Sequence, residues 1–139
     1  MLQRIQSVWL FIAVLCAALT YKFPFYTGNI IGKDNVQRYV KLVASSNYII
    51  LILTAGFIAG TIAIIFMYKN RKHQLWLTVV AACLSVINLI IYFSEVKKFS
   101  SGNMSLSAIF AIAMPILLVL AINGIRKDEK LIKSLDRLR

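Results

Sequence analysis

The architecture follows from one run of residues, YIILILTAGFIAGTIAIIFMY at positions 48–68, which contains no acidic or basic side chain. At about 1.5 Å of rise per residue, a helix of this length covers about 30 Å, the hydrocarbon thickness of a bilayer. A strand of a membrane barrel would instead be about ten residues long and alternate in polarity. The run therefore predicts a transmembrane helix.

Three further apolar runs lie outward from it along the chain, at residues 5–23, 75–93 and 106–125, and none of them contains aspartate, glutamate or arginine. The chain as a whole is 60% hydrophobic and only 15% charged, with a mean hydropathy of +0.77, which is far from the composition of a soluble domain. We predict an all-α integral membrane protein that forms a four-transmembrane-helix bundle. It is expected to be one domain over residues 1–139, with an outer loop at 24–47 and a cytoplasmic tail at 126–139.

Lysine and arginine outnumber aspartate and glutamate by 16 to 5, and the formal net charge is +11. The basic residues concentrate in the short segments on one side of the runs, above all in the connector 69–74 and the tail 126–139. This asymmetry predicts that both termini lie in the cytoplasm. Contact with anionic lipid headgroups accounts for the charge, so we expect membrane lipids as partners and no nucleic acid.

The outer loop contains the sequence DNVQRYVKLV at residues 34–43. Its apolar side chains recur at i, i+3, i+4 and i+7, which predicts a short interfacial helix with Asp34 or Asn35 as its N-cap. Valine and tyrosine also favour a β-strand, which is the alternative. Aromatic residues on this side are expected to form an interfacial belt: Tyr21, Phe23, Phe25, Tyr26, Tyr48, Tyr92 and Phe93.

The residue types that catalysis or metal binding requires are scarce. The single histidine, His73, is expected in a charged cytoplasmic turn, and the five acidic residues lie at or beyond the ends of the apolar runs. Ionisable groups at membrane depth, which proton-coupled export needs, are missing from the runs. We therefore expect a protein that is not an enzyme, with no catalytic, cofactor-binding or metal-binding residues and no cofactor.

The apolar runs do contain residues that mediate contacts between helices. Gly56 and Gly60 form a Gly-x-x-x-Gly motif, whose small residues let two backbones approach closely. The motif predicts either packing inside the bundle or contact with another subunit. Asn88 is expected to hydrogen-bond across helices, and Pro115 is expected to kink the fourth helix because it removes a backbone donor.

The tail is amphipathic. Leu131, Leu135 and Leu138 fall on one helical stripe, and Lys133 and Arg137 occupy the opposite side. We predict a short helix that lies on the inner membrane surface and either serves as a positive-inside stop signal or docks a partner. Together with the helix residues, the candidate contact residues are Gly56, Gly60, Asn88, Leu131, Lys133, Leu135, Arg137 and Leu138.

Three segments resemble a bacterial four-span membrane family, the one catalogued as domain of unknown function 4293. They are the opening MLQRIQS (1–7), the turn YKNRK (68–72) and the closing RKDEKLIKSLDRLR (126–139). The resemblance covers essentially the whole chain, and the tail is its most specific part. It implies an inner-membrane protein with four helices, and it implies no activity and no catalytic or binding residue.

Two functional hypotheses follow. The first is a non-catalytic accessory or scaffold subunit of a larger membrane complex, which contacts another membrane protein or a second copy of itself. The alternative is a transporter or binding protein for an apolar or lipid-like solute. Its cavity between the helices would be lined by Thr54, Thr61, Ser85, Asn88 and the Pro115 kink.

Overall fold

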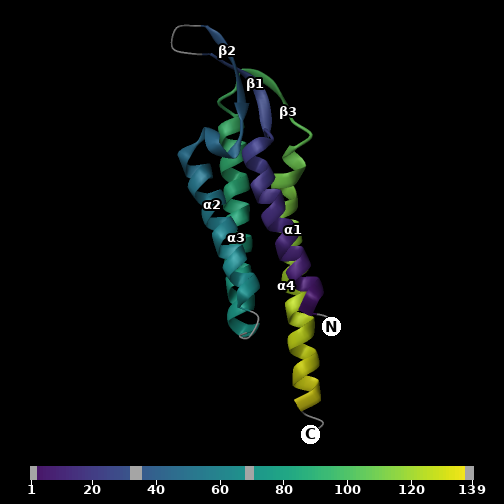
Figure 1. Ribbon diagram of the computed structural model, residues 1–139. Coiled ribbons are helices and arrows are strands. Elements are labelled where there is room, and N and C mark those ends of the chain that lie inside the picture. The colour runs from purple at the N-terminus through teal and green to yellow at the C-terminus, as the bar shows by residue number, and fades with distance from the viewer. Residues whose placement is uncertain (1–2, 32–35, 68–70, 137–139) are drawn as a thin grey trace.

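The protein is described by a computed structural model over residues 3–31, 36–67 and 71–136 (Figure 1). Four helices lie side by side, a small sheet sits at one end of them, and both termini point toward the other end. In chain order the elements are α1 (Gln3–Lys22), β1 (Tyr26–Ile31), β2 (Gln37–Leu42), the 3-10 turn η1 (Ala44–Ser46), α2 (Tyr48–Phe66), α3 (Arg71–Val96), β3 (Ser101–Met104) and α4 (Ala108–Asp136).

Three stretches of helix are long and apolar enough to cross a membrane, as expected of a multi-pass membrane protein: Tyr48–Phe66, Lys72–Val96 and Ala108–Lys130. The apolar part of the first helix, Gln6–Lys22, is shorter. The prediction of apolar helices is thus confirmed, with three candidate spans among the described residues. The helix α3 extends past the predicted run 75–93 at both ends, and α4 extends well past the run 106–125.

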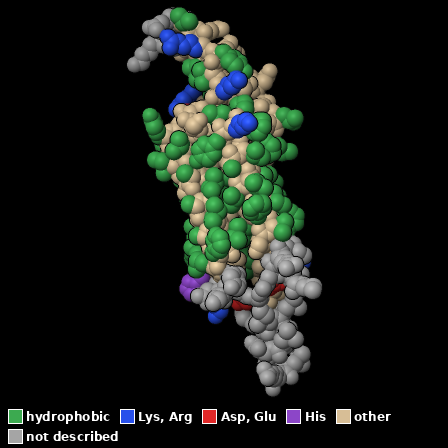
Figure 2. Space-filling view, viewed as in Figure 1, with side chains coloured by type: hydrophobic (Ala, Val, Ile, Leu, Met, Phe, Trp, Pro, Cys, Tyr) green, Lys and Arg blue, Asp and Glu red, His purple; other side chains and the backbone are tan. Residues whose placement is uncertain are grey.

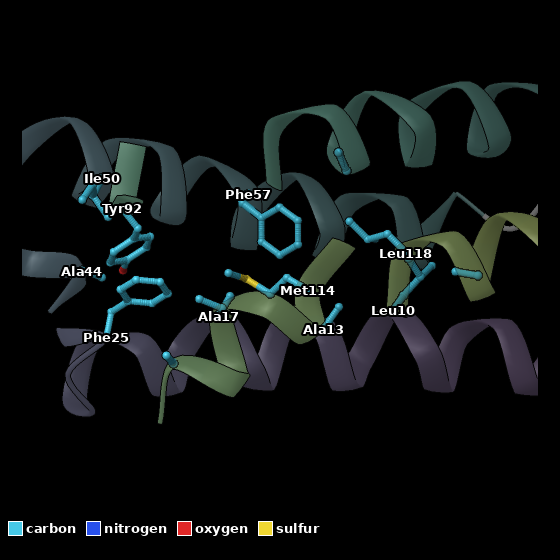
Figure 3. Packing of buried hydrophobic residues seen from close by; sticks show 14 of the residues in the cluster. Leu10, Ala13, Ala17, Phe25, Ala44, Ile50, Phe57, Tyr92, Met114 and Leu118 are labelled. Atoms are coloured by element: carbon cyan, nitrogen blue, oxygen red, sulfur yellow. The ribbon is translucent and has the colours of Figure 1, made fainter. Parts of the chain in front are cut away.

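Each helix packs on two neighbours in the order α1, α2, α3, α4, and the contact between α1 and α4 is the most extensive. Along that contact, Ala13 and Ala17 of α1 lie close to Met114 of α4, and Leu10 lies close to Leu118 (Figure 3). All five side chains are buried. Small alanine side chains allow the two backbones to approach, and the larger side chains fill the remaining space.

The sheet contradicts the predicted interfacial helix at 34–43. Residues 37–42 form β2, whose register with β1 runs from Tyr26 opposite Leu42 to Ile31 opposite Gln37. Residues 34 and 35 lie outside the described part of the chain. The helical spacing was outweighed because the neighbouring strand offers a complete backbone ladder, which suits the strand preference of Val and Tyr.

A third strand joins from far along the chain. β3 pairs with the other edge of β1, so that the strand order is β2-β1-β3 and all pairs are antiparallel. Gly28 lies opposite Gly102. A Cβ on Gly28 would lie 2.3 Å from the Ser101 carbonyl oxygen, and one on Gly102 would lie 2.5 Å from that of Thr27. Glycine is thus required at both positions of this close approach.

Aromatic side chains join the sheet to the bundle. Phe25 stacks on Tyr92 with ring centroids 4.7 Å apart, and it meets Phe93 edge to face at 5.5 Å. Phe25 and Tyr92 are both buried (Figure 3). The predicted interfacial belt is therefore wrong for these two residues, which stack on each other in the protein core. Tyr48 is 86% exposed and remains available for the membrane interface.

The tail is helical up to residue 136, as predicted, but it continues α4, so the prediction of a separate short helix is wrong. A single helix, α4, runs from Ala108 to Asp136, through Pro115 and through the tail residues up to 136 (Figure 1). The chain past Gly124 contains no glycine or proline that would end the helix. Burial of Ile125 and Asp128 also holds the start of the tail in line with the rest of α4.

Candidate functional site

The glycine motif of α2 lies on the outside of the bundle. Gly56 and Gly60 are both exposed, and a Cβ built on either one would meet no atom within 4 Å. The interpretation that the motif packs inside the bundle is therefore wrong. Contact with another subunit through these two glycines stays a prediction.

Asn88 makes the predicted contact between helices. Its Nδ2 donates a hydrogen bond of 3.0 Å to Oγ1 of Thr54, which joins α3 to α2 at a site where both side chains are buried. The prediction of an interhelical hydrogen bond is confirmed. The Oδ1 atom of Asn88 has no hydrogen-bond partner among the described residues.

The other residues proposed to line a solute cavity are engaged in local bonds. The hydroxyl of Thr61 donates to the Phe57 carbonyl at 2.7 Å, and that of Ser85 donates to the Ala82 carbonyl at 2.7 Å. Such bonds satisfy a buried hydroxyl within its own helix. Pro115 lies within α4, which continues without interruption on both sides of it.

The prediction that His73 lies in a turn is wrong. The helix α3 begins at Arg71, so His73 is already helical, and its side chain is exposed. The next residue, Gln74, is buried, and its Nε2 donates to the Ile64 carbonyl at 3.5 Å. This contact ties the start of α3 to the end of α2.

The candidate contact residues of the tail are only partly described. Leu131, Lys133 and Leu135 belong to α4. Arg137 and Leu138 lie outside the described residues. A docking role for these five residues stays a prediction.

The structure adds a polar site that the sequence analysis missed, between α1 and α4 near the termini. Gln6 of α1 and Asp128 of α4 are 6% and 5% exposed, and the Nε2 atom of Gln6 donates a hydrogen bond to Oδ2 of Asp128. The two residues are 122 positions apart in the chain. A buried carboxylate requires such a donor, because an unsatisfied one is costly.

A close approach of the helices allows this contact. A Cβ on Gly124, one turn before Asp128, would lie 2.9 Å from Cγ of Gln6. The space that a larger residue would occupy at 124 is thus filled by the stem of the Gln6 side chain. Among the helical glycines that the structure describes, Gly124 is the one that packs against another helix of the bundle.

Periodicity could have revealed this site. The buried residues of α4 recur every three or four positions at Ala111, Met114, Leu118, Ala121, Ile125 and Asp128. The buried residues of α1 recur in the same way at Gln6, Leu10, Ala13, Ala17 and Thr20. Extending the apolar stripe of each helix to its end would have placed the two polar residues on the shared face.

A pocket of about 330 Å³ opens beside the buried pair. Its wall combines the apolar side chains of Trp9 and Leu120 with the polar side chains of Asn123, Lys127 and Asp128. Lys127 and Asn123 are exposed, whereas Asp128 is buried. The pocket therefore combines a carboxylate in its interior, a cation at its rim and an apolar wall, which are the features that an amphipathic molecule can contact.

Comparison with protein families gives a match that covers nearly the whole chain. The family model described as Domain of unknown function (DUF4293) matches residues 2–138. Curated proteins and solved structures give no match. The match agrees with the resemblance found in the two ends and the central connector of the sequence.

Proposed function

The chain belongs to the family described as Domain of unknown function (DUF4293), and from this premise we propose that it is a non-catalytic accessory or scaffold subunit of a larger complex in the bacterial inner membrane. In this proposal α1 crosses the membrane together with the three longer helices, and both termini face the cytoplasm. A reporter fused after Arg139 is expected to be active in the cytoplasm, and an external reporter signal would contradict this orientation.

The observation that carries the proposal is the open surface around Gly56 and Gly60 on α2. Packing within the bundle does not require glycine at these two positions, since a Cβ on either would have free space. Alanine residues extend the same small surface at Ala55, Ala59 and Ala63, all exposed. In lipid, where apolar surfaces gain little by leaving the solvent, such a surface favours close packing with another helix.

The test is extraction of the tagged full-length protein from its native membrane, followed by sizing and identification of proteins present in fixed proportion. We expect a stoichiometric larger partner. Replacing both Gly56 and Gly60 with leucine is expected to release that partner, because the added side chains block close approach. A monomer or a homo-oligomer without a partner in the unmodified protein would overturn the proposal.

A matched control separates loss of the interface from a general effect of added bulk. Cys83 is exposed on α3, so Cys83→Leu adds a similar side chain to a different outward surface. This variant is expected to keep the partner. Charge reversal at Lys133 and Arg137 tests the tail separately, and it is expected to weaken the association without preventing membrane insertion.

The transporter alternative stays a prediction of a different kind. The hydrogen bonds of Thr54, Thr61, Ser85 and Asn88 within the bundle favour a packing role for these four residues over a role in lining a channel. A protein that purifies alone and retains an apolar solute would favour the alternative over the accessory-subunit proposal.

A further inference from the structure

The pocket between α1 and α4 is lined by two opposite charges at different depths, because Asp128 is buried and Lys127 is exposed. Asp128 and Lys127 are adjacent on α4, and side chains one residue apart on a helix point in different directions. Gln6 supplies Asp128 with a hydrogen bond but with no positive charge. A buried carboxylate of this kind is stabilised by a cation that also donates hydrogen bonds.

The position of the pocket identifies the kind of molecule that can reach it. The candidate span of α4 ends at Lys130, two residues past Asp128, so the pocket lies near the end of that span. Hydrophobic side chains dominate the visible surface along the helices (Figure 2). Trp9 lines the pocket, and tryptophan is typical of the depth at which lipid headgroups meet acyl chains.

We propose that this pocket binds the headgroup of an aminophospholipid of the phosphatidylethanolamine class. The primary ammonium donates hydrogen bonds to the carboxylate of Asp128, and the phosphate accepts from Lys127 and from the side-chain amide of Asn123. The first part of an acyl chain lies against Trp9 and Leu120. The proposal rests on the helices crossing the membrane and not on the partner subunit proposed above.

The same chemistry discriminates among the common phospholipids. Phosphatidylglycerol has the phosphate but no cation for Asp128. Phosphatidylcholine has a cation, but its three methyl groups leave no N–H to donate, and they add bulk. The apolar wall further distinguishes the lipid from free phosphoethanolamine, which carries the same polar groups without an acyl chain.

The experiment is native mass spectrometry of the full-length protein. The protein in detergent is mixed with dioleoyl phosphatidylethanolamine, phosphatidylglycerol or phosphatidylcholine, and the detergent is then removed in the spectrometer. We expect a one-to-one adduct that persists severalfold more with the ethanolamine lipid. Asp128→Asn is expected to lower its retention about tenfold, since one charge-assisted contact is lost. Lys127→Gln is expected to weaken all three lipids and leave their order unchanged.

Two further variants keep the result interpretable. Asn123→Trp fills the exposed rim of the pocket without touching the buried pair, and it is expected to abolish the adduct even if Asp128→Asn fails to fold. Lys97→Gln removes an exposed lysine elsewhere and is expected to have no effect. Equal retention of the three lipids, an adduct that survives Asn123→Trp, or displacement by phosphoethanolamine at the same concentration as the lipid would overturn the proposal.

Discussion

The contact between α1 and α4 and the outward face of α2 use glycine in opposite ways. Gly124 lies against α1, where an added Cβ would come within 2.9 Å of the Gln6 side chain. Gly56 and Gly60 lie in a recognisable Gly-x-x-x-Gly motif, and yet a Cβ added to either would meet no neighbouring atom within 4 Å. Gly124, which belongs to no such motif, packs against a neighbouring helix of the bundle. Gly56 and Gly60, which form the motif, are left open to another molecule. A small residue thus indicates that another backbone or side chain can come close. The tertiary structure shows whether that neighbour belongs to the same bundle or would have to come from another molecule.

Disturbing the close approach of Gly28 to β3 should have the largest effect. Gly28→Ala places a Cβ 2.3 Å from a backbone oxygen of β3, which cannot move without opening the sheet. We expect a loss of about 3 kcal/mol of stability, at the upper end for overpacking. Thermal unfolding in detergent measures it, with Asn29→Ala in the same strand as the control. An unchanged melting temperature would show that β1 and β3 are not so closely paired.

Gly124→Ala should have the next largest effect. The neighbouring atom is the Cγ of a side chain, which can shift more easily than backbone, so we expect a loss of about 1 to 2 kcal/mol. Equilibrium unfolding in detergent measures the loss. Adding Gln6→Ala to this variant should relieve the clash, so the two changes together should cost less than the sum of the two alone. Strict additivity would contradict the packing described here.

The hydrogen bond between Asn88 and Thr54 tests a polar contact between α2 and α3. A double-mutant cycle with Asn88→Ala and Thr54→Ala should give a coupling free energy of about 0.6 to 1.7 kcal/mol, as found for hydrogen bonds between membrane helices. Asn88→Ala paired with Thr78→Ala provides the control, because Thr78 bonds within its own helix. A coupling near zero would mean that the bond adds nothing to the packing of the two helices.

The smallest effect on stability is expected at Gly56 and Gly60, and it should be opposite in sign to the effect at Gly124. Gly56→Ala and Gly60→Ala should not destabilise the isolated protein, and each should stabilise it by about 0.5 kcal/mol because alanine is the better helix former. The same unfolding measurement used for Gly124→Ala detects this. Destabilisation in the isolated protein would show that α2 packs through these glycines within the bundle.

Several errors in the sequence analysis have one cause. The segment 34–43 has a helical spacing, but its residues 37–42 form a strand because β1 offers them a partner. Phe25 and Tyr92 suited a membrane interface, but they stack on each other in the core. The tail suited a surface helix, but the contact of Asp128 with Gln6 kept its first residues in line with α4. In each case a neighbour distant in sequence decided between two locally acceptable states.

The sequence by itself determined the class of the protein and its apolar helices, because apolar runs of membrane length leave few alternatives to a helix. It also predicted the hydrogen bond of Asn88 and the family. Only the tertiary structure decided which side each helix presents to its neighbours. That choice exposes Gly56 and Gly60, buries Gln6 and Asp128, and joins β1 to strands on both sides. It depends on pairings between residues as far apart as 6 and 128, and local spacing does not specify such pairings.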